Sequence, residues 1–184
     1  MHAMIDLETL DTEPTAVVTA VGIVMFDPYS NTPPLHKLYC VTNDWSEQQK
    51  RGRTISGDTV RWWLEQSEES RKALTAPPAE YSISTEGMLF EVAEFFDGYG
   101  NDVELWGNGA DFDNVILGSL YKSYGMKRPW SYSKNRCYRT MNSLPKGKHF
   151  IKPERIGTHH NALDDAITQA VTLQAIFAAQ RKQA

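Results

Sequence analysis

One segment of the chain is almost continuously apolar, and it limits the folds that the rest can adopt. Residues 17–26 read VVTAVGIVMF, rich in β-branched side chains, and Asp27 and Pro28 end the run. A half-exposed strand alternates apolar and polar residues, whereas a strand covered on both faces does not. The run therefore predicts a strand buried on both faces, in a sheet with helices packed against it.

The remaining segments fit the same plan. Further strands are expected at residues 2–7, 38–41 and 103–106. Apolar residues at helical spacing predict helices at residues 57–74 (as two short helices), 84–99, 112–124, 136–144 and 161–180. We therefore expect a single domain of residues 1–184, an α/β fold with a mixed β-sheet flanked by α-helices.

Composition excludes several classes of protein. Hydrophobic residues make up 41% of the 184 residues and aromatic residues 11%, which is too much for a disordered chain. No apolar run approaches the ~18 residues of a membrane span, and the N-terminus lacks the features of a signal peptide. Cys40 and Cys137 stand in no spacing typical of a metal site. We expect a cytoplasmic protein with reduced cysteines and no membrane segment.

The charges are unevenly distributed along the chain. Lys and Arg total 19 against 23 Asp and Glu, but residues 114–153 hold nine basic residues and no acidic one. Aromatic residues are interleaved with these nine. Cations that follow phosphates and rings that stack on bases are typical of proteins that bind single-stranded nucleic acid. The block predicts such a partner; the alternative is a solvated surface over buried aromatic residues.

The first candidate site residues lie in the sequence Ile5-Asp6-Leu7-Glu8-Thr9. Residues i and i+2 of a strand point to the same face, so Asp6 and Glu8 direct two carboxylates at one place. Two like charges are unfavourable there unless a cation lies between them, and a hard divalent ion with oxygen ligands would supply that charge. The alternative is a strand end with solvated carboxylates.

A second candidate segment, WGNGADFDN at residues 106–114, follows a short strand and opens a helix. Loops in this position often carry functional sites, and helix N-termini favour negative charge. Asp111 or Asp113 could equally cap the helix.

The third candidate segment, HHNALDDA at residues 159–166, opens the last helix. Asn161 is suited to cap that helix, and Asp164 is an ordinary residue for its first turn. Asp165 lies near the apolar stripe, where a carboxylate needs a cation or a hydrogen-bond donor. His160 stands just outside the helix, within reach of the same place.

Together these segments resemble a known family. Their order, D-x-E, then F-D before a helix, then H-x(4)-D, resembles the DEDDh 3′–5′ exonucleases of the ribonuclease H-like superfamily, such as ribonuclease T and oligoribonuclease. The resemblance runs from Ile5 to about Phe177. The segment TVRWWL at residues 59–64 is further similar to a branch containing exonuclease A of T-even phages and the RNase AS-type exoribonucleases.

The resemblance implies a ribonuclease H-like sheet and an active site that holds two divalent cations, Mg²⁺ or Mn²⁺. By position, the metal ligands fall on Asp6, Glu8, Asp113 and Asp165, and the histidine that acts as general base falls on His160. These five residues are the expected catalytic set. Asp11 stands where the family often has glycine. The expected substrate-binding residues are Leu7, Thr9, Trp62, Asn108, Phe112, Arg136 and Arg139.

The expected function is hydrolysis of single-stranded DNA or RNA from its 3′ end, releasing nucleoside 5′-monophosphates. The sequence does not distinguish DNA from RNA. Because relatives form homodimers, the resemblance also allows a homodimer. The alternatives are a catalytically inactive nucleic-acid-binding module and an oligoribonuclease-like scavenger of very short RNA. The long basic block argues against the scavenger, and the complete catalytic set argues against the inactive module.

Overall fold

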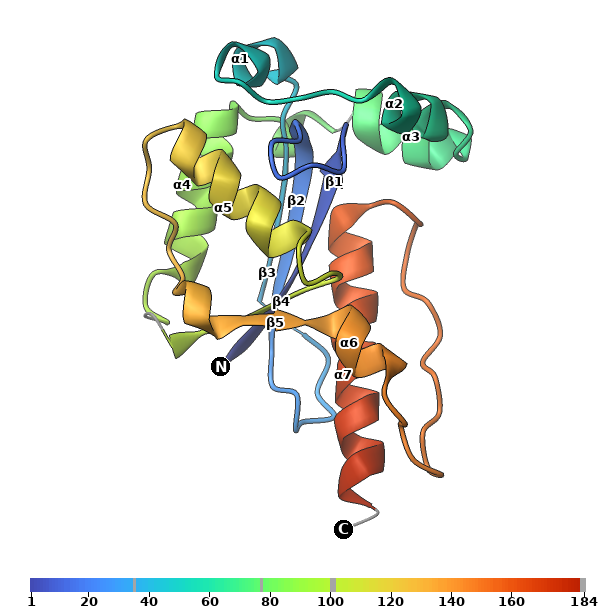
Figure 1. The fold of residues 1–184 in the computed structure, drawn as a ribbon. Helices are drawn as coiled ribbons and strands as arrows, with labels where there is room; N and C mark the ends of the chain where they lie inside the picture. Colours follow the sequence, from blue (N-terminus) through green and yellow to red (C-terminus); the bar gives the residue numbers. More distant parts are fainter. Residues whose placement is uncertain (35, 77, 100–101, 183–184) are drawn as a thin grey trace.

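A computed structural model describes residues 1–34, 36–76, 78–99 and 102–182. At its centre is one five-stranded sheet with the strand order β3-β2-β1-β4-β5 (Figure 1). The strands are β1 (His2–Thr9), β2 (Val18–Phe26), β3 (Lys37–Val41), β4 (Glu104–Gly107) and β5 (Asn135–Cys137). β2 is antiparallel to both of its neighbours, whereas β1, β4 and β5 run parallel. The sheet is therefore mixed, as predicted.

The two longest strands form the middle of the sheet. Every residue of β2 is buried, as its apolar run predicts. β1 is longer than expected: it continues past Leu7 because Glu8 and Thr9 still pair with β2, across a register shift between these two residues. Pairing with the central strand thus keeps Glu8 in an extended conformation on the same strand as Asp6.

Seven α-helices surround the sheet in the described residues. They are α1 (Trp45–Lys50), α2 (Gly57–Leu64), α3 (Glu68–Thr75), α4 (Thr85–Phe96), α5 (Asp113–Ser123), α6 (Tyr138–Ser143) and α7 (Ala162–Arg181). Short 3₁₀ turns lie at η1 (Ala79–Tyr81) and η3 (Tyr132–Lys134). Across the described ranges, no helix has the length and apolar character needed to cross a membrane.

The prediction of a helix at residues 136–144 was wrong at its start. Arg136 and Cys137 belong to β5, and the helix begins only at Tyr138. β5 pairs with β4, which is nearly 30 residues earlier in the chain, with Trp106 opposite Arg136. Pairing with the distant strand β4 overrides the local helical pattern of these two residues. This pairing cannot be predicted from the local sequence.

Both faces of the sheet are covered by helices (Figure 1). α4 and α5 pack on one face, whose core includes Ile5 and Leu7 of β1. α7 packs on the other face, where Met4 is buried against it. Because side chains alternate along a strand, Asp6 and Glu8 share the face of Met4 and point toward α7.

α7 approaches the sheet closely because small residues lie at the contact. A Cβ atom added to Gly22 of β2 would lie 2.2 Å from the carbonyl carbon of Ala162, at the start of the helix. Ala166 and Ala170 continue the contact and are fully buried. Asn161 caps the helix, with its side-chain oxygen accepting backbone hydrogen bonds from the first turn. The start of α7 is therefore fixed against the middle of the sheet.

Replacing Gly22 with alanine should lower the free energy of unfolding by about 1–3 kcal/mol or more, because the methyl group overlaps the Ala162 backbone. Urea unfolding measures the change. Gly57→Ala is the matched control, since an added Cβ there meets nothing within 4 Å. Equal effects of the two substitutions would contradict a special role for the contact at Gly22.

Candidate active site

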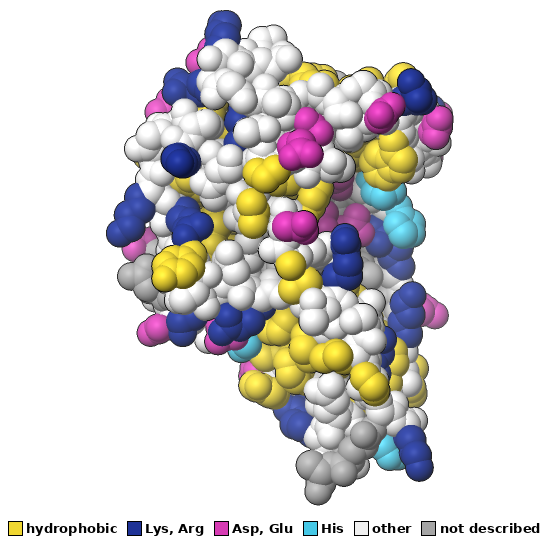
Figure 2. Space-filling model, viewed as in Figure 1, with side chains coloured by type: hydrophobic (Ala, Val, Ile, Leu, Met, Phe, Trp, Pro, Cys, Tyr) yellow, Lys and Arg dark blue, Asp and Glu magenta, His cyan; other side chains and the backbone are white. Residues whose placement is uncertain are grey.

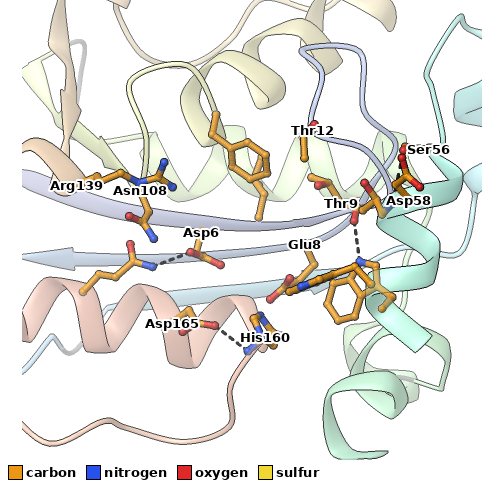
Figure 3. A pocket seen from close by; sticks show the side chains of 16 residues that line it. Asp6, Glu8, Thr9, Thr12, Ser56, Asp58, Asn108, Arg139, His160 and Asp165 are labelled. Atoms are coloured by element: carbon orange, nitrogen blue, oxygen red, sulfur yellow. Dashed lines mark hydrogen bonds between the residues drawn. The ribbon is translucent and has the colours of Figure 1, made fainter. Parts of the chain in front are cut away.

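Carboxylates from the end of β1 and the start of α7 converge on one place (Figure 3). Asp6 and Glu8 project from β1 toward α7, and Asp165 lies in the first turn of that helix. One oxygen atom from each of these three side chains lies within 4.8 Å of the other two. The fold thus brings together two segments that are more than 150 residues apart in the sequence.

Hydrogen bonds fix the orientation of two of these carboxylates. The side-chain amide of Gln169, one turn after Asp165 on α7, donates to Asp6 Oδ1 at 2.7 Å. The backbone N–H of His160 donates to Asp165 Oδ2 at 2.9 Å. Arg155 donates to Asp165 Oδ1 at 2.7 Å and forms an ion pair with it. α7 and the segment before it therefore position both side chains.

Asp113 brings a fourth carboxylate from the start of α5. Its Oδ1 accepts a hydrogen bond from the backbone N–H of Leu7 at 3.1 Å, and its Oδ2 accepts one from Asn108 at 2.6 Å. Gly107 leaves room for this side chain, since an added Cβ would lie 3.1 Å from Asp113 Oδ2. Asp111 is exposed, so the buried aspartate against β1 is Asp113.

Burial and mutual repulsion disfavour the charged forms of these acids. Burial and then the nearby charge of Asp113 raise the pKa of Asp6 well above its usual range. Burial and the charge of Asp165 do the same to the pKa of Glu8. Burial raises the pKa of Asp113 to about 6, although two backbone N–H donors favour its charged form. The carboxylates of the cluster are therefore only partly balanced by positive charge.

The donor set suits a hard divalent cation. Glu8 Oε1 is buried and has no hydrogen-bond partner among the described residues. Carboxylate oxygens are preferred ligands of Mg²⁺ and Mn²⁺, and a cation among them would remove their repulsion. Asp6, Glu8 and Asp165 fit such an ion, with Asp113 next to Asp6.

His160 lies beside this cluster in an unusual backbone conformation. Its φ is 59°, and it is the only non-glycine residue with a positive φ in the described part of the chain. Its ring packs edge-on against Trp62 and Trp63, with centroids 4.8 and 5.9 Å away. Burial lowers the pKa of His160, which favours the neutral imidazole that can accept a proton.

The two adjacent tryptophans have different surroundings. Trp63 is 3% exposed, and its indole N–H donates to the Thr9 carbonyl oxygen at 2.9 Å. Trp62 is 42% exposed and faces the cavity beside the cluster. Neighbouring helix residues point about 100° apart, so one ring can anchor α2 to β1 while the other faces solvent.

A cavity of about 690 Å³ contains these groups. The predicted residues that line it are Asp6, Leu7, Glu8, Thr9, Trp62, Asn108, Phe112, Arg139, His160 and Asp165. Asp113 does not line the cavity but lies behind the lining, held by β1. Figure 2 shows acidic and histidine side chains in a hollow between the α2–α3 region and the start of α7.

The basic block of residues 114–153 is not gathered at this cavity. Of its nine basic residues, all within the described ranges, Arg139 alone is part of the lining. Arg136 was expected to contact substrate, but the structure does not bring it to the cavity. Its guanidinium instead forms a bidentate pair with Glu104 at 2.9 and 3.0 Å. Figure 2 shows Lys and Arg side chains scattered over the visible face.

Comparison with known proteins identifies the family. The model of the Rv2179c-like 3′-5′ exoribonuclease domain matches residues 1–177. The chain belongs to this family. An exodeoxyribonuclease of Enterobacteria phage T4 is 26% identical over 129 residues, which cover 65% of this chain and 55% of that protein. The chain thus spans about half the length of this curated relative.

Solved structures share the fold of this Rv2179c-like domain. The nuclease domain of 3′hExo, a DEDDh family member bound to rAMP, matches with a TM-score of 0.58 and 12% identity, over 98% of this chain and 92% of that one. E. coli exonuclease I, in complex with a 5cy-dT13 oligonucleotide, matches with a TM-score of 0.59 and 13% identity, over 98% and 41%. The predicted ribonuclease H-like α/β fold and the resemblance to DEDDh exonucleases are confirmed.

Two residues at the site of this exonuclease family member were missed from the sequence. Gln169 follows Asp165 by four residues on a helix, so helical spacing alone could have placed it on the same face. Arg155 lies just beyond the acid-free block, and no sequence pattern connects it with Asp165. Its contact depends on the path of the segment before α7.

Glu8→Gln should raise the melting temperature of the metal-free protein, because it removes one buried charge from a cluster of like charges. Saturating Mn²⁺ should stabilise the wild type and have little effect on this variant. In the metal-free wild type, the raised pKa values of Asp6 and Glu8 mean that the folded state binds more protons than the unfolded state. Its stability should therefore fall as pH rises from about 4 toward 7.

Thermal denaturation in EDTA and in Mn²⁺, at several pH values, tests the Glu8→Gln prediction. Glu94→Gln, on the exposed side of α4, is the matched control and should behave like the wild type. A wild type that Mn²⁺ does not stabilise would contradict the metal site.

Proposed function

We propose that the protein is a metal-dependent 3′–5′ exonuclease that hydrolyses single-stranded DNA or RNA and releases nucleoside 5′-monophosphates. The observation that carries this proposal is the convergence of Asp6, Glu8 and Asp165, whose oxygen atoms lie within 4.8 Å of one another. Membership of a 3′-5′ exoribonuclease family supports the same reaction.

The four acidic residues would hold two Mg²⁺ or Mn²⁺ ions. When bound, such ions activate the attacking water and stabilise the negative charge that develops on the phosphate and the leaving oxygen. The contribution of the chain is to orient its carboxylates by hydrogen bonds. Gln169 orients Asp6, the His160 N–H orients Asp165, and the Leu7 N–H orients Asp113.

His160 is the proposed general base. Its imidazole is half-buried against Trp62, and its lowered pKa keeps it neutral and able to accept the proton of the attacking water. The hydrogen bond from its backbone to Asp165 ties the base to a metal ligand. A shift of α7 would therefore move both groups together.

Substrate would occupy the cavity in extended form. Arg139 and Asn108 lie on one side of Asp6 and His160 on the other (Figure 3). We assign Arg139 to a phosphate and the exposed ring of Trp62 to a base, because stacking on aromatic rings suits unpaired nucleotides. Leu7 and Thr9, beside the carboxylates, would contact the terminal nucleotide.

The names and bound ligands of the similar proteins include both RNA and DNA. The family is named for exoribonuclease activity, and the phage relative is an exodeoxyribonuclease. One matching structure holds rAMP and another a dT13 oligonucleotide. The deciding assay therefore includes both substrates.

The assay uses 5′-labelled single-stranded RNA, single-stranded DNA and duplexes, each with Mn²⁺, Mg²⁺ or EDTA. We expect ladders that shorten from the 3′ end with metal and none with EDTA. Asp165→Asn should lower the rate by at least about 10³-fold. Asp164→Asn is the control and should stay within about threefold, because an amide oxygen can still accept the hydrogen bond from Thr158.

Loss of activity in Asp164→Asn but not in Asp165→Asn would contradict the assignment of the third motif. Nucleic-acid binding without any metal-dependent laddering would instead support an inactive binding module.

His160→Ala should lower turnover by about 10²–10⁴-fold while leaving Mn²⁺ affinity close to that of the wild type. His160→Asn is the matched variant, since asparagine tolerates the positive φ at this position and so preserves the backbone. Single-turnover rates and calorimetric Mn²⁺ titration measure the two quantities. Near-normal turnover in His160→Asn would exclude His160 as the base.

A further inference from the structure

An arginine from outside the catalytic set enters the acidic cluster. Arg155 lies on the segment between α6 and α7, and its guanidinium donates to Asp165 Oδ1 at 2.7 Å. The same guanidinium donates to the Thr158 carbonyl oxygen at 2.7 Å. Among the described residues, no other Lys or Arg lies within 4.0 Å of the carboxylates of Asp6, Glu8 or Asp165.

The contact occupies an oxygen that a metal ligand needs. Asp165 Oδ2 already accepts the backbone N–H of His160, and Arg155 takes Oδ1. Arg155 thus supplies part of the charge that the cluster lacks.

The surrounding segment is fastened independently of this ion pair. The Thr158 N–H donates to Asp164 Oδ2 at 2.7 Å, and the Ile156 N–H donates to Thr168 Oγ1 at 3.1 Å. Both acceptors lie on α7, so the backbone stays on the helix if the arginine side chain leaves Asp165. Only the long, partly exposed side chain has to move.

We propose that Arg155 is a replaceable counter-ion: it neutralises the metal-free site and gives up Asp165 when a divalent cation binds. This inference rests on the proposed metal-dependent function. The guanidinium and the cation compete for the same carboxylate and repel each other. The ion pair therefore stabilises the protein without metal and weakens metal binding.

Calorimetric titration of Mn²⁺ into the wild type and Arg155→Gln tests the inference. The variant should bind Mn²⁺ about two- to fivefold more tightly, the factor expected for loss of one partly exposed ion pair. In EDTA its melting temperature should be lower than that of the wild type, and the increase on adding Mn²⁺ should be larger. Neither readout requires nucleic acid or turnover.

Lys152→Gln is the matched control, because it removes one positive charge from an exposed position on the same segment. Its Mn²⁺ affinity should equal that of the wild type. Arg155→Lys keeps the charge but loses the planar fork that joins Asp165 to Thr158, so its affinity should lie between those of the wild type and Arg155→Gln. If Arg155→Gln does not fold, the Mn²⁺ affinity of Arg155→Lys relative to the wild type tests the inference instead.

Unchanged or weaker Mn²⁺ binding by folded Arg155→Gln would overturn the inference, since Arg155 would then only position Asp165. An equal gain in affinity in Lys152→Gln would also overturn it, because a general charge effect would explain the result. Absence of Mn²⁺ binding in the wild type and every variant would overturn the proposed metal site, and this inference with it.

Discussion

Repulsion among carboxylates is the constraint on which the arrangement of the candidate site depends. Four acids from three separate elements share a small, partly buried volume, where unpaired charge is costly. Hydrogen-bond donors offset part of this cost: two backbone N–H groups reach Asp113, the amide of Gln169 reaches Asp6, and a backbone N–H and an arginine reach Asp165. Glu8 Oε1 has no such donor among the described residues. In the proposed function, a bound cation would supply the positive charge that balances the remaining carboxylates.

The same strand serves both the core and the site. Alternation along β1 sends Ile5 and Leu7 into the core beneath α4 and α5, and sends Asp6 and Glu8 toward α7. The distance from these carboxylates to Asp165 depends on how closely α7 meets the sheet, and Gly22 allows that approach. The packing of Gly22 against the start of α7 thus helps to set the spacing of these carboxylates.

Sequence patterns could predict what depends on local geometry. The period of two on β1 placed Asp6 and Glu8 on one face, and the apolar run predicted β2. The helix opening left Asp111 and Asp113 as alternatives, and the family resemblance selected Asp113. Sequence patterns failed where long-range pairing decides the outcome. Arg136 lies in an edge strand beside Glu104 rather than in a helix, and Arg155 reaches Asp165 through an irregular segment whose path no periodicity describes.

Charge distribution along the chain also differs from charge distribution in space. The acid-free block contributes only Arg139 to the cavity, while Arg155, from outside that block, forms an ion pair with Asp165. A phosphate in the cavity faces the carboxylates of Asp6, Glu8 and Asp165, and among the described residues of the lining Arg139 is the one Lys or Arg. In the proposed function, attraction at the cluster would come from bound cations, and the scattered lysines and arginines act over longer distances, where salt screens them. In the proposed function, substrate binding would therefore depend on metal binding, because the same cations would neutralise the carboxylates and attract the phosphate.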